Sequence, residues 1–144
     1  MYSTWDRPIE VDTAATAWLI RRFVSPAAVF VFEPTGTLRM PGTAFDTPSA
    51  EDSRRGNRTV AEYWARKHNL EDPALERLLS VVHDIEINVW QPKATAEAPG
   101  LAAVFRGLSE IEPRRPECLM RGMEIIDALY ADFARQSRTA SPAK

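Results

Sequence analysis

The sequence has 144 residues with a formal net charge of −2, and 44% of its residues are hydrophobic and 26% charged. This composition is typical of one globular domain, and it excludes both a disordered chain and a generally basic surface that would attract nucleic acid. No apolar run approaches the roughly 20 residues of a membrane span, and acidic residues precede the first apolar stretch, unlike in a signal peptide. We therefore expect a cytoplasmic protein without a membrane segment.

The first half of the sequence predicts one helix and two short strands. Apolar residues follow Asp12 at mixed spacings of three and four, which predicts a helix that ends at Pro26. The β-branched and aromatic run at 28–32 predicts a buried strand, and 43–46 predicts a second short strand. The segment that follows, 50–58, is charged and is expected to form a loop.

The second half predicts four helices. Thr59 and Glu62 have the spacing of a capping box, and the helix that they begin is expected to end near His68. The other three helices are expected to open at prolines, namely Asp72-Pro73, Pro99 and Pro116. The sequence therefore predicts a helix-dominated α+β fold with about five helices and two or three short strands. We expect a single domain over residues 1–134 and a disordered tail over residues 135–144.

The residues that could carry chemistry are acids and one histidine. No glycine-rich nucleotide motif or GxSxG elbow is present, and the single cysteine, Cys118, excludes an internal disulfide and a CxxC zinc site. Purely structural roles remain open for the acids and the histidine, such as helix capping for Asp12 and solvation for Glu51. Asp127 follows Ile126 in a strongly apolar helix, so we expect it to be buried and paired with an arginine. The candidates are Asp12, Asp46, Glu51, His83, Asp84 and Asp127.

Five blocks follow one another over about residues 5–133: RPIEVDTAATAWLIRRF (7–23), FDTPSAE (45–51), DPAL (72–75), VHD (82–84) and DALYA (127–131). In this order they resemble the C-terminal domain of the chromate-resistance protein ChrB family. The resemblance implies a link to chromate-responsive regulation of an efflux operon. Full ChrB proteins also have an N-terminal DNA-binding region, which this sequence lacks, so we do not expect direct binding to an operator.

The sequence departs from the family pattern in one block. After the FDxPxxE motif the family usually continues into His, Gly and Cys, whereas this sequence has RRGNRT at 54–59. A metal-binding His supplies a nitrogen lone pair, while Arg54, Arg55 and Arg58 carry permanent charges and have no lone pair to give. We therefore expect a metal site of the family to be weakened or lost in this chain, and an anion site or a silent site to replace it.

Three classes of function remain, of which the first is a binding or sensory module. Guanidinium groups present planar donor forks to tetrahedral dianions such as chromate or sulfate. The candidate residues for such a ligand are Arg7, Arg54, Arg55 and Arg58, together with Asp46 and Asp127. A divalent metal (Fe, Mn or Zn) is the other ligand considered. We predict that its ligands converge in one pocket, and these are Asp12, Glu51, His83 and Asp84.

The second class is a metal-dependent enzyme in which a His–carboxylate pair does acid–base work. One cysteine and the lack of a cofactor motif make an enzyme the less favoured alternative, and an interaction domain without a ligand is the third. The expected partners are a small oxyanion or metal ion, and either a second copy of the chain or a separate regulator protein. Neither nucleic acid nor a membrane is expected as a direct partner.

Overall fold

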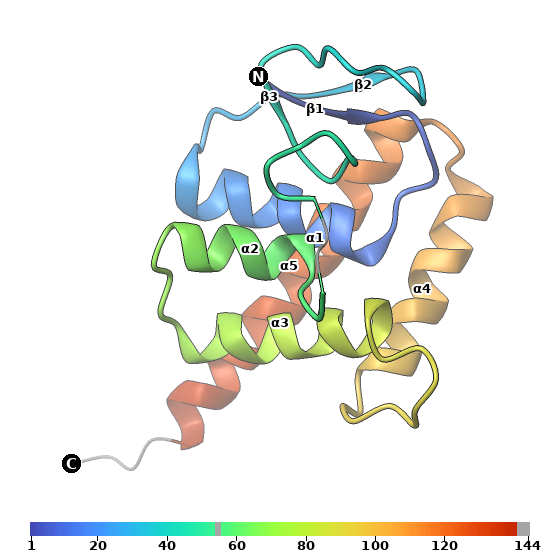
Figure 1. Cartoon of the computed structure of the whole chain (residues 1–144). Helices are drawn as coiled ribbons and strands as arrows, with labels where there is room; N and C mark the ends of the chain where they lie inside the picture. The colour runs from blue at the N-terminus through green and yellow to red at the C-terminus, as the bar shows by residue number, and fades with distance from the viewer. Residues whose placement is uncertain (54–55, 141–144) are drawn as a thin grey trace.

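The computed structural model describes residues 1–53 and 56–140 of the chain. A small parallel sheet lies at one end of a group of helices, and the long last helix, α5 (Arg115–Ala140), runs behind several of the others (Figure 1). The elements in chain order are β1 (Tyr2–Trp5), α1 (Val11–Leu19), η1 (Ile20–Val24), β2 (Phe30–Glu33), β3 (Thr43–Ala44), α2 (Val60–Lys67), α3 (Pro73–Glu86), α4 (Ala98–Ile111) and α5 (Arg115–Ala140). This arrangement confirms the predicted helix-dominated α+β fold.

The sheet has the order β2-β1-β3, and both pairs of neighbouring strands are parallel. The predicted strands at 28–32 and 43–46 correspond to β2 and β3, whereas the central strand β1 was not predicted. Tyr2 pairs with Phe30 on one side and with Thr43 on the other. Just before β3, Gly42 has a φ of 62°, and an added Cβ there would lie 2.2 Å from the Met1 carbonyl oxygen. Only glycine fits this close approach of the two segments.

The core is built around α1, which is buried along its whole length and packs against α2, α3 and α5. Small side chains such as Ala14 and Ala17 allow the neighbouring helices to approach closely. On α5, Gly122 faces the same contact, because an added Cβ would lie 3.2 Å from Ala14 Cβ and 3.1 Å from the Phe105 ring. Close packing of α1, α4 and α5 therefore depends on small residues at their contacts.

Two helix boundaries differ from the sequence-based expectation. The first helix has Glu10 as its N-cap, so Asp12 lies inside the first turn instead of capping the helix. The last helix continues to Ala140, so residues 135–140, expected to belong to a tail, extend α5. Among residues 1–53 and 56–140, no helix combines the length and the apolar character needed to cross a membrane.

Candidate functional site

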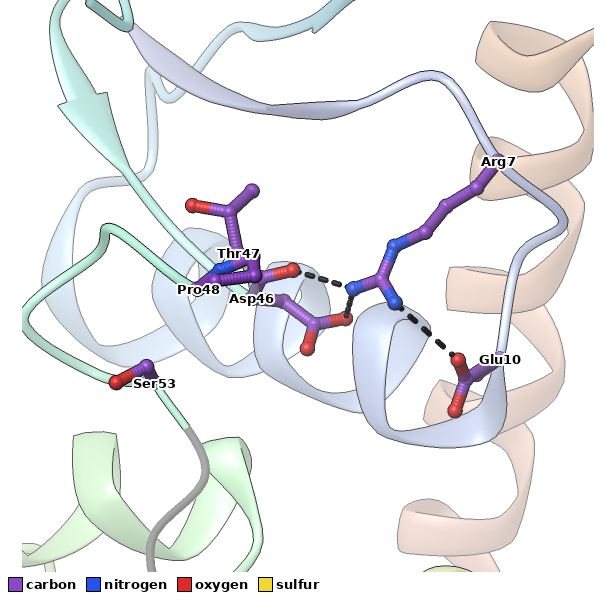
Figure 2. A pocket seen from close by; sticks show the side chains of 6 residues that line it. All are labelled: Arg7, Glu10, Asp46, Thr47, Pro48 and Ser53. Atoms are coloured by element: carbon purple, nitrogen blue, oxygen red, sulfur yellow. Dashed lines mark hydrogen bonds and ion pairs between the residues drawn. The ribbon is translucent and has the colours of Figure 1, made fainter. Parts of the chain in front are cut away.

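A pocket of about 370 Å³ opens where the loops after β1 and β3 meet the start of α1 (Figure 2). Because β1 and β3 are parallel, their carboxyl ends lie at the same edge of the sheet, which is where open parallel sheets commonly bind ligands. The chain after β1 supplies Arg7 and Glu10, and the chain after β3 supplies the rest of the wall. The lining residues are Arg7, Glu10, Asp46, Thr47, Pro48 and Ser53.

Arg7 reaches across this pocket and connects its two sides (Figure 2). Its Nη2 atom donates a hydrogen bond to the carbonyl oxygen of Asp46 and lies 3.1 Å from Oδ2 of the same residue. Its Nη1 atom lies 3.4 Å from Oε1 of Glu10. The Arg7 side chain remains 32% exposed, so the guanidinium has both protein partners and access to the solvent.

Asp46 is the most constrained residue of the pocket. Its backbone is in the left-handed region, with a φ of 51°, which Asp tolerates better than most residues. Its Oδ2 atom accepts a hydrogen bond from the Thr13 hydroxyl at 2.5 Å, while Oδ1 accepts none from the described residues. Burial raises the pKa of Asp46 to about 7, the nearby Asp12 carboxylate adds to this, and Arg7 opposes it.

Asp52 lies behind Asp46 and connects the pocket to α2. Its Oδ1 atom accepts a hydrogen bond from the Asp46 backbone N–H at 2.9 Å, and its Oδ2 atom accepts one from Trp64 Nε1 at 2.6 Å. Burial raises the pKa of Asp52 to about 6, although both hydrogen bonds favour the ionised form. Asp52 was not singled out in the sequence, because one aspartate in a charged loop gives no signal that it is buried.

Asp12 is completely buried and caps a helix to which it does not belong. Its carboxylate accepts hydrogen bonds from the backbone N–H groups of Val60 and Ala61, both at 2.9 Å. Thr59 and Glu62 form the predicted capping box at the same helix end. The first N–H groups of α2, which have no partner inside the helix, are thus bonded to side chains.

A second cleft, of about 600 Å³, lies between the first turn of α2, the last turns of α3 and the loop that follows α3. Within it, His83 Nδ1 lies 2.8 Å from Glu62 Oε1, the same atom that accepts the Thr59 backbone N–H at 2.9 Å. These two bonds hold the pKa of Glu62 below its usual value against the effect of burial. The sequence signal for Glu62 was its capping role, and its contact with His83 comes from the packing of two helices.

Asp84 lines the same cleft and organises the loop after α3. Its carboxylate accepts hydrogen bonds from the Asn88 amide, from the backbone N–H groups of Ala94 and Thr95, and from the Thr95 hydroxyl. These four bonds outweigh the effect of burial and hold the pKa of Asp84 far below its usual value. The loop presents Trp90, which is 93% exposed.

The four predicted metal ligands do not converge. Asp12 caps α2, His83 pairs with Glu62 and Asp84 binds its loop, as described above, while Glu51 is 75% exposed and lies 3.2 Å from Lys67. Across residues 1–53 and 56–140, no three His, Cys, Asp or Glu side chains come together in a way that could hold a metal. Their role as metal ligands stays a prediction, and their separate positions give it no geometric support.

The remaining predicted residues are scattered. Arg58 lies over the Tyr63 ring, at 4.7 Å from its centroid, and does not line the Arg7 pocket. Asp127 is 57% exposed, so the prediction that it is buried was wrong. It lies 3.8 Å from Arg22, the expected kind of partner, and accepts a hydrogen bond from Trp18 Nε1 at 2.9 Å. Arg54 and Arg55 lie outside the described residues.

Comparison with known proteins gives two matches, and both are to ChrB. The model of the family described as "ChrB, C-terminal domain" matches residues 2–133. Protein ChrB of Cupriavidus metallidurans is 32% identical over 126 residues, which make up 86% of this chain and 38% of that relative. The chain therefore spans well under half the length of this relative. No solved structure matches the chain.

Proposed function

The chain belongs to the C-terminal domain family of the chromate-resistance protein ChrB, and we propose that it binds a small tetrahedral oxyanion beside Arg7. The observation that carries this proposal is a partly exposed guanidinium held across a pocket of about 370 Å³. Guanidinium groups bind oxyanions through two parallel hydrogen bonds, and the planar fork of Arg7 is already oriented by Asp46 and Glu10.

Hydroxyl groups in the pocket wall support the same class of ligand. Thr47 and Ser53 both line the pocket. The Thr47 hydroxyl is buried and has no hydrogen-bond partner among the described residues, which is unusual for a buried polar group. Because this hydroxyl has almost no accessible surface, Thr47 would have to turn its side chain toward the pocket to donate a hydrogen bond to a bound anion.

A sensory role is the finer part of the proposal. Arg7 contacts Asp46, the Asp46 backbone binds Asp52, and Asp52 binds the Trp64 indole on α2. An anion that competes with Asp46 for the Arg7 guanidinium would alter the first contact of this series. We propose that the position of α2 responds to this change and transmits the presence of the ligand to a partner.

Titration calorimetry with chromate and with sulfate tests the proposal. Arg7→Gln removes the guanidinium and should lower the affinity for both anions by about 10-fold or more, because a hydrogen bond to a charged group contributes about 1.5–3 kcal/mol. Arg66→Gln is the matched control, since Arg66 is an exposed arginine on α2 that does not line the pocket. Equal affinities of the two variants, or no binding by the unmodified protein, would contradict an anion site beside Arg7.

A further inference from the structure

The Arg7 pocket presents an electrostatic difficulty for any doubly charged anion. Its one described basic side chain is already paired with two carboxylates, those of Asp46 and Glu10. Two further carboxylates, those of Asp12 and Asp52, lie behind Asp46 and affect the same region. A dianion that entered this pocket would be repelled by the ionised Asp46 unless that charge were removed.

We propose that Asp46 is a proton-carrying ligand of this site, so that a doubly charged oxyanion binds together with one proton that the Asp46 carboxylate takes up from solvent. This inference rests on the proposed function, because it concerns the same anion at the same pocket. The proton neutralises Asp46, weakens its ion pair with Arg7 and leaves the guanidinium available to the anion. No covalent bond to the anion forms or breaks.

The geometry places the proton on one particular oxygen. Oδ2 of Asp46 already accepts the Thr13 hydroxyl and faces Arg7, whereas Oδ1 accepts no hydrogen bond from the described residues. An ionised carboxylate can only accept hydrogen bonds, but a protonated carboxyl group has one O–H to donate. A proton on Oδ1 therefore turns a repelling wall of the pocket into a hydrogen-bond donor toward the anion.

The surroundings of Asp46 favour this protonation near neutral pH. Within residues 1–53 and 56–140, the charged groups that face it are Arg7 from the loop after β1, Glu10 and Asp12 from the start of α1, and Asp52 from the loop before α2. Three of these four are acids, and Asp46 is almost completely buried, with its pKa raised to about 7. A bound dianion adds more negative charge and raises this pKa further, so anion affinity should increase as the pH falls toward 7.

Asp52 does not fit this role, although its pKa is also raised. Both of its oxygens already accept hydrogen bonds, from the Asp46 backbone and from Trp64, and it does not line the pocket. Glu10 also lines the pocket, but its side chain is 42% exposed, so it lacks the burial that distinguishes Asp46. Among the acids that the structure describes, Asp46 is thus the one that combines burial, contact with the pocket and an oxygen without a described hydrogen-bond donor.

The test is calorimetry with sulfate, which carries no proton of its own near neutral pH, so that any proton taken up must come to the protein. Titrations in two buffers with different ionisation enthalpies count the protons bound per sulfate. We expect the unmodified protein to take up close to one proton above about pH 7.5, and its affinity to fall about 10-fold per pH unit there. Asp46→Asn should lose both effects, while Glu110→Gln, which removes an exposed carboxylate on α4 that does not line the pocket, should keep them.

The outcomes separate this inference from the proposed function. Asn tolerates the left-handed backbone of position 46 and can still accept the Thr13 hydrogen bond, so the variant should fold. Sulfate binding without proton uptake, or uptake that persists in Asp46→Asn, would overturn the role of Asp46 and leave the anion site intact. Failure of sulfate to bind at any pH would overturn the proposed function, and this inference with it.

Discussion

Asp12 stabilises the beginning of α2 although it belongs to α1. Its carboxylate lies where the first N–H groups of α2 point, and the positive end of the helix dipole favours a negative charge at that position. The sequence offered helix capping as one role for Asp12, but for the helix that follows it in the sequence and not for α2. The residues between Asp12 and Val60 contain no signal that could have revealed their contact, which depends on how α1 and α2 pack.

Replacing Asp12 should therefore destabilise the fold strongly. Asp12→Ala leaves the N–H groups of Val60 and Ala61 buried without their acceptor, and we expect the free energy of unfolding to fall by about 2–4 kcal/mol. Asp12→Asn keeps one acceptor oxygen and should cost less. Urea denaturation of the three proteins measures this difference, and equal stabilities would show that the cap contributes little.

Replacing Asp127 should change the stability less than replacing Asp12. Asp127 is exposed, whereas the sequence suggested that it is buried. Its ion pair with Arg22 is 3.8 Å long, and both side chains are about half-exposed. Such pairs contribute roughly 0–1 kcal/mol, and Asp127→Ala also removes the acceptor of the Trp18 indole N–H, a bond that contributes about 0.5–1.5 kcal/mol. The free energy of unfolding should therefore fall by about 1–2 kcal/mol. The same urea assay, with Asp12→Ala as the comparison, measures it. A loss above about 3 kcal/mol would instead indicate a buried pair.

The sequence predicted those helix starts whose signal lies in the few residues around the start itself. Thr59 with Glu62 and Asp72 with Pro73 occupy the expected cap positions of α2 and α3, because a capping side chain bonds to backbone groups only two or three residues away. The central strand β1 was missed for the opposite reason. Its four residues become a strand only by pairing with residues 30–33 and 43–44, and such distant partners leave no pattern in the segment itself.

The loop between α3 and α4 depends on a single carboxylate. Asp84 binds the backbone N–H groups of Ala94 and Thr95, and Lys93 binds the carbonyl oxygen of Asp84 at 3.0 Å. Asp84→Ala should release the loop and speed hydrogen exchange at residues 94 and 95 by about 10-fold or more, with little change in α1. Exchange measured by NMR distinguishes this local loosening from global unfolding, which would speed exchange in α1 as well.

At the scale of the whole molecule, α2 lies between the two clefts. On α2, the Val60 N–H of the first turn donates to Asp12, and the Trp64 indole donates to Asp52. Glu62, on the same helix, contacts His83 in the second cleft. Individual residues of these clefts were among the candidates from the sequence, but their division into two places was not predicted. That division follows from helix packing, since the predicted metal set drew residues from α1, α3 and the loop before α2.

The buried acids should give the protein an unusual dependence of stability on pH. The folded-state pKa values of Asp46 and Asp52 are about 7 and about 6, above the usual value of an unfolded aspartate, so the folded protein binds more protons in this range. Stability should therefore rise as the pH falls from about 8 to about 5, by about 1.4 kcal/mol per pH unit for each group that is titrating.

Below about pH 4 the trend should reverse, because Asp84 has a lowered pKa and its stabilising contribution is lost as it becomes protonated. Thermal or urea denaturation across this range measures the curve. In Asp46→Asn the rise should become shallower around pH 7. A free energy of unfolding that stays constant between pH 5 and 8 would show that the two acids ionise normally in the folded protein.

The hydrogen bond between Trp64 and Asp52 gives the protein a built-in optical probe. The chain has four tryptophans, of which Trp18 and Trp64 are buried and Trp90 is almost fully exposed. A quencher such as acrylamide reaches Trp90 first, so the emission that remains comes chiefly from the shielded indoles. Among these, Trp64 donates its N–H to a carboxylate whose backbone partner, Asp46, lines the Arg7 pocket. The residual fluorescence can thus follow events in that pocket without any label attached to the chain.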